Sequence, residues 1–529
     1  MNPRSVLPPR RILAALASTV VLFVSGCATY QQQSADFAQS TRSGSLAAAV
    51  TEIDKKAEAS KGSKDEIIWR LEQGASLRTA ALADPSLVPP IPAPVPASAP
   101  TPEASAEGVV ATPVVPTAEE VHMYYLRRSN AAFDLAEARV NAYEEEAKIK
   151  VGSELGSALT NQANMPYRGR AYDKVMMNAY KAINYLQLGR VDDARVELNR
   201  SLQRQRDAVA ENEKRIAEAQ EIAQRAKTGE VQTEDSKSAA YDTEKAMNDP
   251  KTGSALQAAL NESLAPMKPY GDYVNPFAVF LDGLFFSTLG ENGSDWERGR
   301  KSLERVAAIV PENPYLQQDL QLAADAAEGK VAEGITYVIF ETGTGPFRDQ
   351  VRIDIPTFLV TSRLAYVGAA FPKLRYNNDY IANLAVSSGD LSLTTSTIAS
   401  MDSIVANDFK NEWPTIVTKT LITTASKAIA QAVAQKVAED RGGMWGGLIA
   451  GAAMGILNAS TNIADTRGWI SLPKEFQYAR LQTPADRQLT LQAGGSTQSV
   501  SLMPGSVNVV YVKSSSSSAP LLVSQFALK

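Results

Sequence analysis

The sequence has little cysteine or histidine: its 529 residues contain one of each, Cys27 and His122. Serine–histidine catalytic triads, and zinc sites built from several histidines or cysteines, need these side chains in sets. His122 lies beside Met123 and Tyr124 at the start of a predicted helix, where we expect an exposed or half-packed residue. The sequence therefore predicts no metal site, no cofactor and no catalytic residue set, and we do not expect an enzyme.

A strong positive charge is also missing. The formal net charge is −5, and it falls to −8 when residues 1–26, with their three arginines and no acidic residue, are removed. Nucleic-acid binding depends on basic surfaces that meet phosphates, so we expect no nucleic-acid partner. Beyond residue 26, no stretch of about twenty apolar residues has the form of a membrane-spanning helix.

The first 27 residues have the pattern of an export signal. Three arginines precede an apolar run at 12–24, and small residues lead to Gly26 and Cys27. This run fits a signal peptide and is too short for a permanent membrane span. The segment resembles the lipobox of bacterial lipoproteins, which implies acylation of Cys27 and cleavage between Gly26 and Cys27. The alternative is an ordinary secretory signal with a chance cysteine.

Lipidation of Cys27 would leave the mature chain without a free thiol, which excludes a disulfide, a cysteine nucleophile and a redox role. Two or three fatty chains hold a protein at a bilayer almost permanently, since each buried CH₂ contributes about 0.8 kcal/mol. In the lipoprotein pattern, a residue other than aspartate after the cysteine implies the outer membrane, and here Ala28 follows. We therefore expect an outer-membrane lipid anchor with a periplasmic body.

The mature chain changes composition along its length. Residues 27–45, rich in glutamine and serine, predict a flexible tether, and 46–333 predict a helical domain. Two inserts interrupt that domain. Residues 84–117 contain ten prolines and predict an extended linker, in preference to a partner-recognition motif. Residues 203–249 are charged and predict a protruding helix followed by a mobile loop.

Helix–turn–helix repeats are indicated in the helical part. Small residues at fixed positions allow two helices to approach closely, and the spacings resemble the tetratricopeptide repeat, whose stacked helix pairs form a binding groove. A third pair would join 67–81 to a helix around 129–136 and place the proline-rich insert in its turn. The positions that carry the resemblance are Tyr185, Leu188, Gly189, Ala194, Leu198 and Ser201 in one copy, Trp296, Gly299, Leu303, Val306, Ala307 and Pro311 in another, and Ser129, Phe133 and Ala136 in the third.

From residue 334 the sequence turns to short, β-branched segments bounded by turn residues. Helices at 413–464 interrupt them, with Pro414 suited to the first turn of a helix over 414–439. The chain is therefore predicted to be an α+β multidomain protein, with a tetratricopeptide-like all-α region followed by a mainly-β domain at 334–529 that has an inserted helix pair. The expected strands are 335–340, 351–355, 365–367, 384–386, 391–394, 469–472, 476–481, 488–491, 500–502, 507–512 and 521–526.

Three glycines recur every fourth residue in 442–463, namely Gly447, Gly451 and Gly455, and so share one face of a predicted helix. Glycine inside a helix costs up to about 1 kcal/mol relative to alanine, so the pattern needs a compensating gain. Close packing on the preceding alanine-rich helix and oligomerisation, including a homo-oligomer, are the favoured explanations. Membrane insertion is the alternative, and the apolar core of about fourteen residues argues against it.

Two further motifs contain residue types that can bind a ligand or a partner. Residues 341–348 superficially resemble a phosphate-binding loop, but the lysine and hydroxyl pair is missing and Pro346 lacks an amide donor. A tight turn between strands is the better interpretation. Asp465, Arg467 and Trp469 lie just before a predicted strand and suggest either a salt-bridged corner, which we favour, or a contact with a partner.

Together, the lipobox, the helical repeats and the segments 353–356 and 464–467 resemble an uncharacterised family of bacterial tetratricopeptide-like lipoproteins. The resemblance implies a role in cell-envelope assembly beside lipoproteins similar to the curli secretion channel and to activators of penicillin-binding proteins. It implies no catalytic residues. We expect a non-enzymatic adaptor or scaffold that binds an envelope protein through its helical groove. The alternatives are a lipoprotein regulator of a cell-wall synthase, in which the proline-rich stretch spans the periplasm, and an unrecognised periplasmic enzyme.

Overall fold

The computed structural model places the greater part of the chain from Tyr30 onward. Of residues 442–461 only the backbone is described. In the described part, no helix combines the length and the apolar character that a membrane crossing needs. Gly26 and Cys27 lie outside the described residues, which are 30–92, 115–149, 162–230, 232–233, 236–237, 240–267, 270, 274–330, 333–359, 365–461 and 463–529.

A five-stranded sheet forms the centre of the molecule. Its strands lie in the order β13 (Leu522–Ala527), β12 (Val507–Ser514), β3 (Ile335–Thr342), β9 (Glu475–Gln482) and β8 (Ser396–Ser400). β12 runs parallel to β3, and the other neighbouring pairs are antiparallel. Every residue of β3 and of β12 is buried, as expected for strands covered on both faces.

Two smaller sheets extend the strand-rich part. The four-stranded sheet has the order β11 (Ser496–Ser501), β10 (Gln488–Ala493), β6 (Ala385–Ser388) and β7 (Leu391–Thr394). A long antiparallel ribbon consists of β4 (Phe347–Pro356) and β5 (Tyr366–Arg375). A short pair consists of β1 (Gln232–Thr233) and β2 (Ser236–Lys237).

Consecutive helices pack closely at the three places where the sequence predicts helix pairs. They are α4 (Glu66–Ala81) with α5 (Ala118–Ile149), α7 (Ala171–Gln187) with α8 (Val191–Thr228), and α11 (Pro276–Leu289) with α12 (Gly293–Ile309). Close approach depends on glycine: a Cβ on Gly74 would lie 2.3 Å from Cε1 of Phe133, and one on Gly299 would lie 2.7 Å from the amide nitrogen of Ser287. The α4–α5 pair therefore packs closely across the proline-rich insert.

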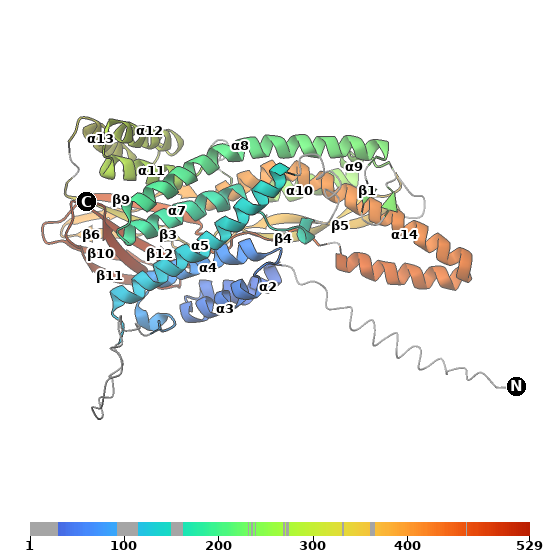
Figure 1. Cartoon of the computed structure of the whole chain (residues 1–529), viewed down its shortest axis with the longest axis horizontal. Coiled ribbons are helices and arrows are strands. Elements are labelled where there is room, and N and C mark those ends of the chain that lie inside the picture. Colours follow the sequence, from blue (N-terminus) through green and yellow to red (C-terminus); the bar gives the residue numbers. More distant parts are fainter. Residues whose placement is uncertain are drawn as a thin grey trace, which may run out of the picture.

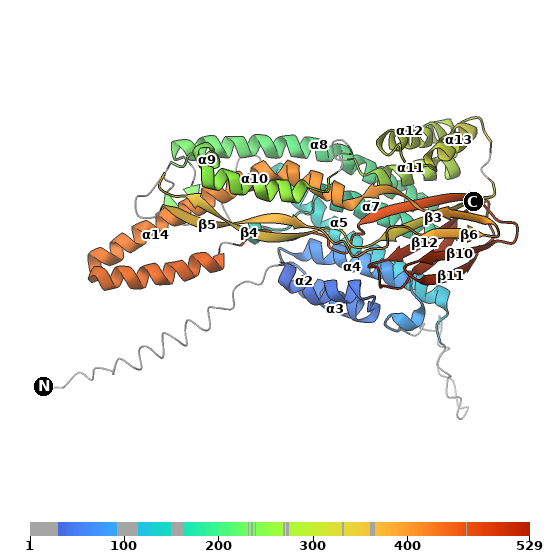
Figure 2. The same cartoon turned by 180° about the vertical axis from the view of Figure 1, so that it is seen from behind.

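The first helices of these pairs pack against the central sheet, as Figures 1 and 2 show for α4, α7 and α11. The ring of Phe277 on α11 stacks on that of Phe476 on β9, with centroids 3.8 Å apart. Tyr180 on α7 also contacts Phe476. One continuous hydrophobic core extends from α2 (Tyr30–Arg42) to the last strand, so the change from helices to strands near residue 334 is not a break in the core.

The expected tether at 27–45 is largely helical, which corrects that prediction. Within α2, Tyr30, Ser34 and Phe37 form a buried face, and Phe37 is fully covered. Three buried residues among many glutamines and serines gave too weak a periodicity to identify the helix. The remaining helices are α3 (Leu46–Ala59), α9 (Thr243–Met247), α10 (Pro250–Leu264), α13 (Leu316–Ala327) and the short η1 (Pro85–Leu87) and η2 (Gln162–Asn164).

The helix inserted between β8 and β9 is α14 (Met401–Thr461), and it begins earlier than predicted. Pro414 lies inside this helix and not in its first turn, so that prediction is wrong. The preceding turns bury Met401, Val405 and Phe409, whose packing holds the helix together despite the missing amide donor. Figures 1 and 2 show α14 leaving the body beside α8 and the β4–β5 ribbon and extending beyond them. We call α9, α10, this ribbon, α14 and the C-terminal half of α8 the arm.

Two strand predictions also need correction. Residues 469–472 form a turn and not a strand, because the amides of Ile470 and Ser471 donate to the carboxylate of Glu72 and not to a neighbouring strand. β8 was not predicted, since it offers only a short mixed sequence. It pairs with β9 through an irregular register.

Candidate functional site

A buried ionic cluster joins the helical part to the central sheet. The Glu341 carboxylate on β3 accepts hydrogen bonds from Arg78 Nη1 on α4 at 2.9 Å and from Lys513 Nζ on β12 at 2.5 Å. The hydroxyls of Tyr180 and Tyr511 also donate to it. Glu341 is 0% exposed, and its partners come from three segments distant in sequence. We call these residues the Glu341 cluster.

Charge compensation explains how the Glu341 cluster tolerates burial. Burial alone would raise the pKa of Glu341, but Lys513 and Arg78 outweigh it and lower the pKa. The guanidinium of Arg78 lies between two rings, 4.5 Å from the centroid of Tyr180 and 4.4 Å from that of Tyr511. This favours an ionised, fixed arrangement that fastens α4 to the sheet.

A second ionic cluster lies where α7, β4 and α14 meet. The Glu412 carboxylate accepts from Arg170 Nη1 at 2.8 Å and from Arg348 Nη2 at 2.6 Å. Burial would raise the pKa of Glu412, but the two arginines outweigh it and hold the pKa far below its usual range. Arg348 is 2% exposed. We call these three residues the Glu412 cluster. It ties the base of the arm to the body.

The residues of the predicted corner lie beside the Glu412 cluster. Arg467 Nε donates to Asp465 at 2.7 Å, and Arg467 Nη1 reaches Asp65 at 2.9 Å. The indole of Trp469 is 2% exposed and donates to Ser471 Oγ at 3.0 Å. This geometry fits the salt-bridged corner. The alternative of a partner contact does not fit, because Arg467 and Trp469 are covered by the chain's own residues.

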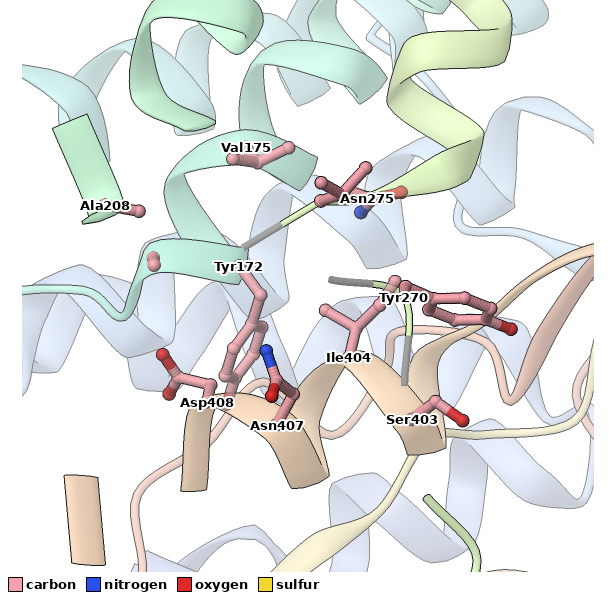
Figure 3. A pocket seen from close by; sticks show the side chains of 11 residues that line it. Tyr172, Val175, Ala208, Tyr270, Asn275, Ser403, Ile404, Asn407 and Asp408 are labelled. Carbon is pink, nitrogen blue, oxygen red and sulfur yellow. The ribbon is translucent and has the colours of Figure 1, made fainter. Parts of the chain in front are cut away.

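A small cavity opens between α7, α11 and α14, and Figure 3 shows its lining. Asp408 lines it, and neither of its carboxyl oxygens has a hydrogen-bond partner among the described residues. Tyr172 and Asn407 lie next to Asp408 in the same view. Burial raises the pKa of Asp408 more than the neighbouring arginines lower it. This carboxyl group therefore ionises less readily than that of an exposed aspartate.

The small volume of this cavity limits what it can hold. Its volume is about 20 Å³, which suits one water molecule, since a water needs roughly 10–15 Å³ of such space. A protonated Asp408 could donate a hydrogen bond to that water. No group of three or more histidine, cysteine, aspartate or glutamate side chains within the described ranges could hold a metal ion.

The structure describes the surroundings of only some of the other residues that the sequence singled out. His122 is half-buried in α5, and its Nδ1 lies 2.7 Å from the carbonyl oxygen of Ala81. Gly447, Gly451 and Gly455 belong to the α14 backbone, but what surrounds them is outside the described residues. Cys27 itself also lies outside the described residues. The turn expected within 341–348 is present between β3 and β4.

Sequence reasoning missed the ionic clusters. Their members are far apart in sequence: Arg78 and Glu341 are separated by 263 residues and Arg170 and Glu412 by 242. One signal was available in the sequence. Glu341 and Arg348 are the first and last residues of the 341–348 segment that superficially resembles a phosphate-binding loop. An acid at the end of an apolar strand indicates a buried partner, but the sequence does not say which.

Comparison of the chain with protein-family models, with curated proteins and with solved structures gives no significant match.

Proposed function

We propose that the protein is a lipid-anchored, non-enzymatic adaptor of the bacterial cell envelope, with tetratricopeptide-like helix pairs and a protein partner. The lipid is attached at Cys27, and the body lies in the periplasm at the outer membrane. The support for the anchor is the lipobox-like segment that ends in Gly26 and Cys27. A large polar body confined by fatty chains can act only within reach of its membrane.

The observation that carries this proposal is the short connection between the lipidated position and the folded body. α2 begins three residues after Cys27. Its first residue, Tyr30, donates to Glu72 Oε1 at 3.0 Å and packs on Trp69 with ring centroids 4.9 Å apart. A fatty chain on Cys27 would therefore hold the body close to the bilayer with a restricted orientation. A fixed position and orientation at the bilayer suits a scaffold, whereas an enzyme that diffuses freely would not need them.

The support for a partner surface on the arm is that the sheet covers the helices of the predicted groove. The first helices of the three pairs, which would line a repeat groove, are packed against the chain's own sheet. In α7, for example, residues 171–184 are all buried. The arm instead has exposed apolar side chains on successive turns of α14: Val433 is 58% exposed and Val437 is 43% exposed. We therefore propose that the envelope partner contacts the arm.

Cross-linking in living cells tests this proposal. A photo-reactive residue at Val437 should cross-link to one envelope protein, and the product should be lost when Cys27→Ser prevents anchoring. The same residue at Lys301, 68% exposed on α12, is the control and should give no such product. Absence of a Val437 product, or the same product from both sites, would contradict the adaptor.

The identity of the captured protein also separates the adaptor from a regulator of a cell-wall synthase. A secretion channel would support the adaptor, and a synthase would support the regulator. One observation weighs against the regulator: α4 and α5 pack on each other at Gly74 and Phe133, so the two ends of the proline-rich stretch are held near one another. A stretch fixed at both ends does not lengthen the reach of the molecule across the periplasm.

A further inference from the structure

A cavity of about 180 Å³ lies beneath α2. It has room for several water molecules, each of which takes roughly 30 Å³ in the liquid. It is far larger than the cavity at Asp408 and is partly open to solvent, so a ligand could enter it. One wall is α2, and the other consists of residues around β3–β4, the segment after β5 and the segment before β9. They include Thr344, Phe347, Asn377 and Ile470.

α2 is held firmly over this cavity but does not fill it. At one end Tyr30 bonds to Glu72, and near the middle Phe37 is fully buried. At the other end the carbonyl oxygen of Arg42 accepts a hydrogen bond from Ser516 Oγ at 2.8 Å. Between these fixed points the residues that line the cavity are small, Ala38 and Thr41 among them. The helix therefore forms one wall of the cavity without filling it.

The polar groups of the wall favour an acceptor. Arg348 lines the cavity, and its Nε has no hydrogen-bond partner among the described residues, although its Nη2 is bound to Glu412. The hydroxyl of Thr41 is also buried without a partner in the described part of the chain. Both groups are donors, and a guanidinium matches a carboxylate in shape as well as charge. The side chains of Phe37, Phe347 and Ile470 supply an apolar surface.

We propose that this cavity binds a small monocarboxylate with a short apolar chain. The carboxylate lies toward Arg348 and Thr41, and the chain lies along Phe37 and Ile470. A bound ligand would join α2 to the body at a second place and stiffen the connection that leads to Cys27. The inference concerns the cavity alone and does not depend on lipidation or on a protein partner.

Calorimetric titration of the full chain tests this site with hexanoate as the probe and hexanol as its uncharged counterpart. We expect saturable binding of hexanoate, and at least about tenfold weaker binding of hexanol, the equivalent of one hydrogen bond to a charged group. Saturable binding that does not distinguish the two probes would overturn the carboxylate assignment. Absence of saturable hexanoate binding would overturn the site.

Variants locate the binding. Ala38→Leu adds bulk inside the cavity and should weaken hexanoate binding at least about tenfold, whereas Gln39→Leu, on the exposed side of the same helix, should leave it unchanged. Thr41→Val removes only the hydroxyl and should weaken binding several-fold, which keeps the test valid if Ala38→Leu unfolds. Thermal unfolding checks the fold of each variant. If Thr41→Val and a folded Ala38→Leu both bind hexanoate as tightly as the unaltered protein, the ligand lies elsewhere and the proposal fails.

Discussion

The body and the outer turns of α14 differ in which side chains they cover. In the body, Lys181 on α7 is 1% exposed, whereas on the arm Val433 of α14 is 58% exposed. Lys181 can be buried because Asp134, Glu137 and Glu197 surround its ammonium group at 2.7–2.9 Å. A helix face is covered here where the tertiary fold supplies interaction partners for its side chains. The polarity of the residue matters less than the presence of these partners.

The strongest test of this difference is to replace each of the two residues with alanine. Lys181→Ala should lower the free energy of unfolding by about 3–5 kcal/mol, because it removes the buried ammonium group between Glu137 and Glu197 and leaves them only the half-exposed Arg200 and the amide of Asn178. Val433→Ala should change it by less than about 0.5 kcal/mol. Urea unfolding measures both values. Equal losses from the two variants would show that the arm is packed as tightly as the body.

The second prediction concerns Glu72, which fastens α2 to the body. Burial raises the pKa of Glu72 to about 7, although hydrogen bonds from Ser471, Ile470 and Tyr30 act to lower it. Because the folded pKa is above the unfolded one, its contribution to stability is full below about pH 4.5 and is lost as the pH rises through about 7. The loss is on the order of 3 kcal/mol.

Glu72→Gln stays uncharged and should remove that part of the pH dependence. We expect the variant to lose less stability than the unaltered protein between pH 5 and pH 8, as measured by denaturant unfolding at each pH. Asp173, Asp319 and Asp402, whose burial raises their pKa values to about 6, remain in both proteins and contribute to the slope that is left. Identical slopes in the two proteins would mean that Glu72 is ionised throughout.

The third prediction tests the α4–α5 pair. Gly74→Ala places a Cβ about 2.3 Å from the ring of Phe133, and overpacking of this kind costs about 1–3 kcal/mol, which outweighs the gain in helix propensity. Gly293→Ala is the matched control, since nothing lies within 4 Å of a Cβ there. Thermal unfolding should show a lower midpoint for the first variant only. A stable Gly74→Ala protein would argue against close pairing across the insert.

The smallest effect is expected in the proline-rich stretch. Replacing residues 93–114 with a glycine–serine chain of equal length keeps Val88 buried and keeps the bond from Tyr125 Oη to the carbonyl oxygen of Pro89. The free energy of unfolding should change by less than about 0.5 kcal/mol, because loop-closure entropy depends mainly on length. A marked fall in stability, or a broad transition, would assign this stretch a role in the folded body.

Local patterns predicted much of the fold. The helix pairs at α7–α8 and α11–α12, most strands and the mixed helix-and-strand character all follow from periodicity and turn residues. The start of α14 was missed because Pro414 suggested a first turn, and α2 because its apolar face is short. Both helices depend on the burial of Phe409 and Phe37 in the tertiary fold, which the local sequence does not reveal.

The ionic clusters could not be predicted in the same way. Arg78, Glu341 and Lys513 come from separate segments, and nothing local links them. The pair of Asp465 and Arg467 could be predicted, because its members are two residues apart. Pairing across long sequence separations depends on how α4 and α7 lie on the sheet, and a single sequence does not specify this arrangement.

Mass spectrometry of the N-terminal peptide, from protein isolated from its host's envelope, tests the central claim most directly. The account predicts a chain that begins at Cys27 and carries fatty acyl groups on its sulfur and its amino group. A peptide with an unmodified Cys27, or one that still carries residues 1–26, would contradict the lipid anchor, and with it the proposal that α2 holds the body against a membrane.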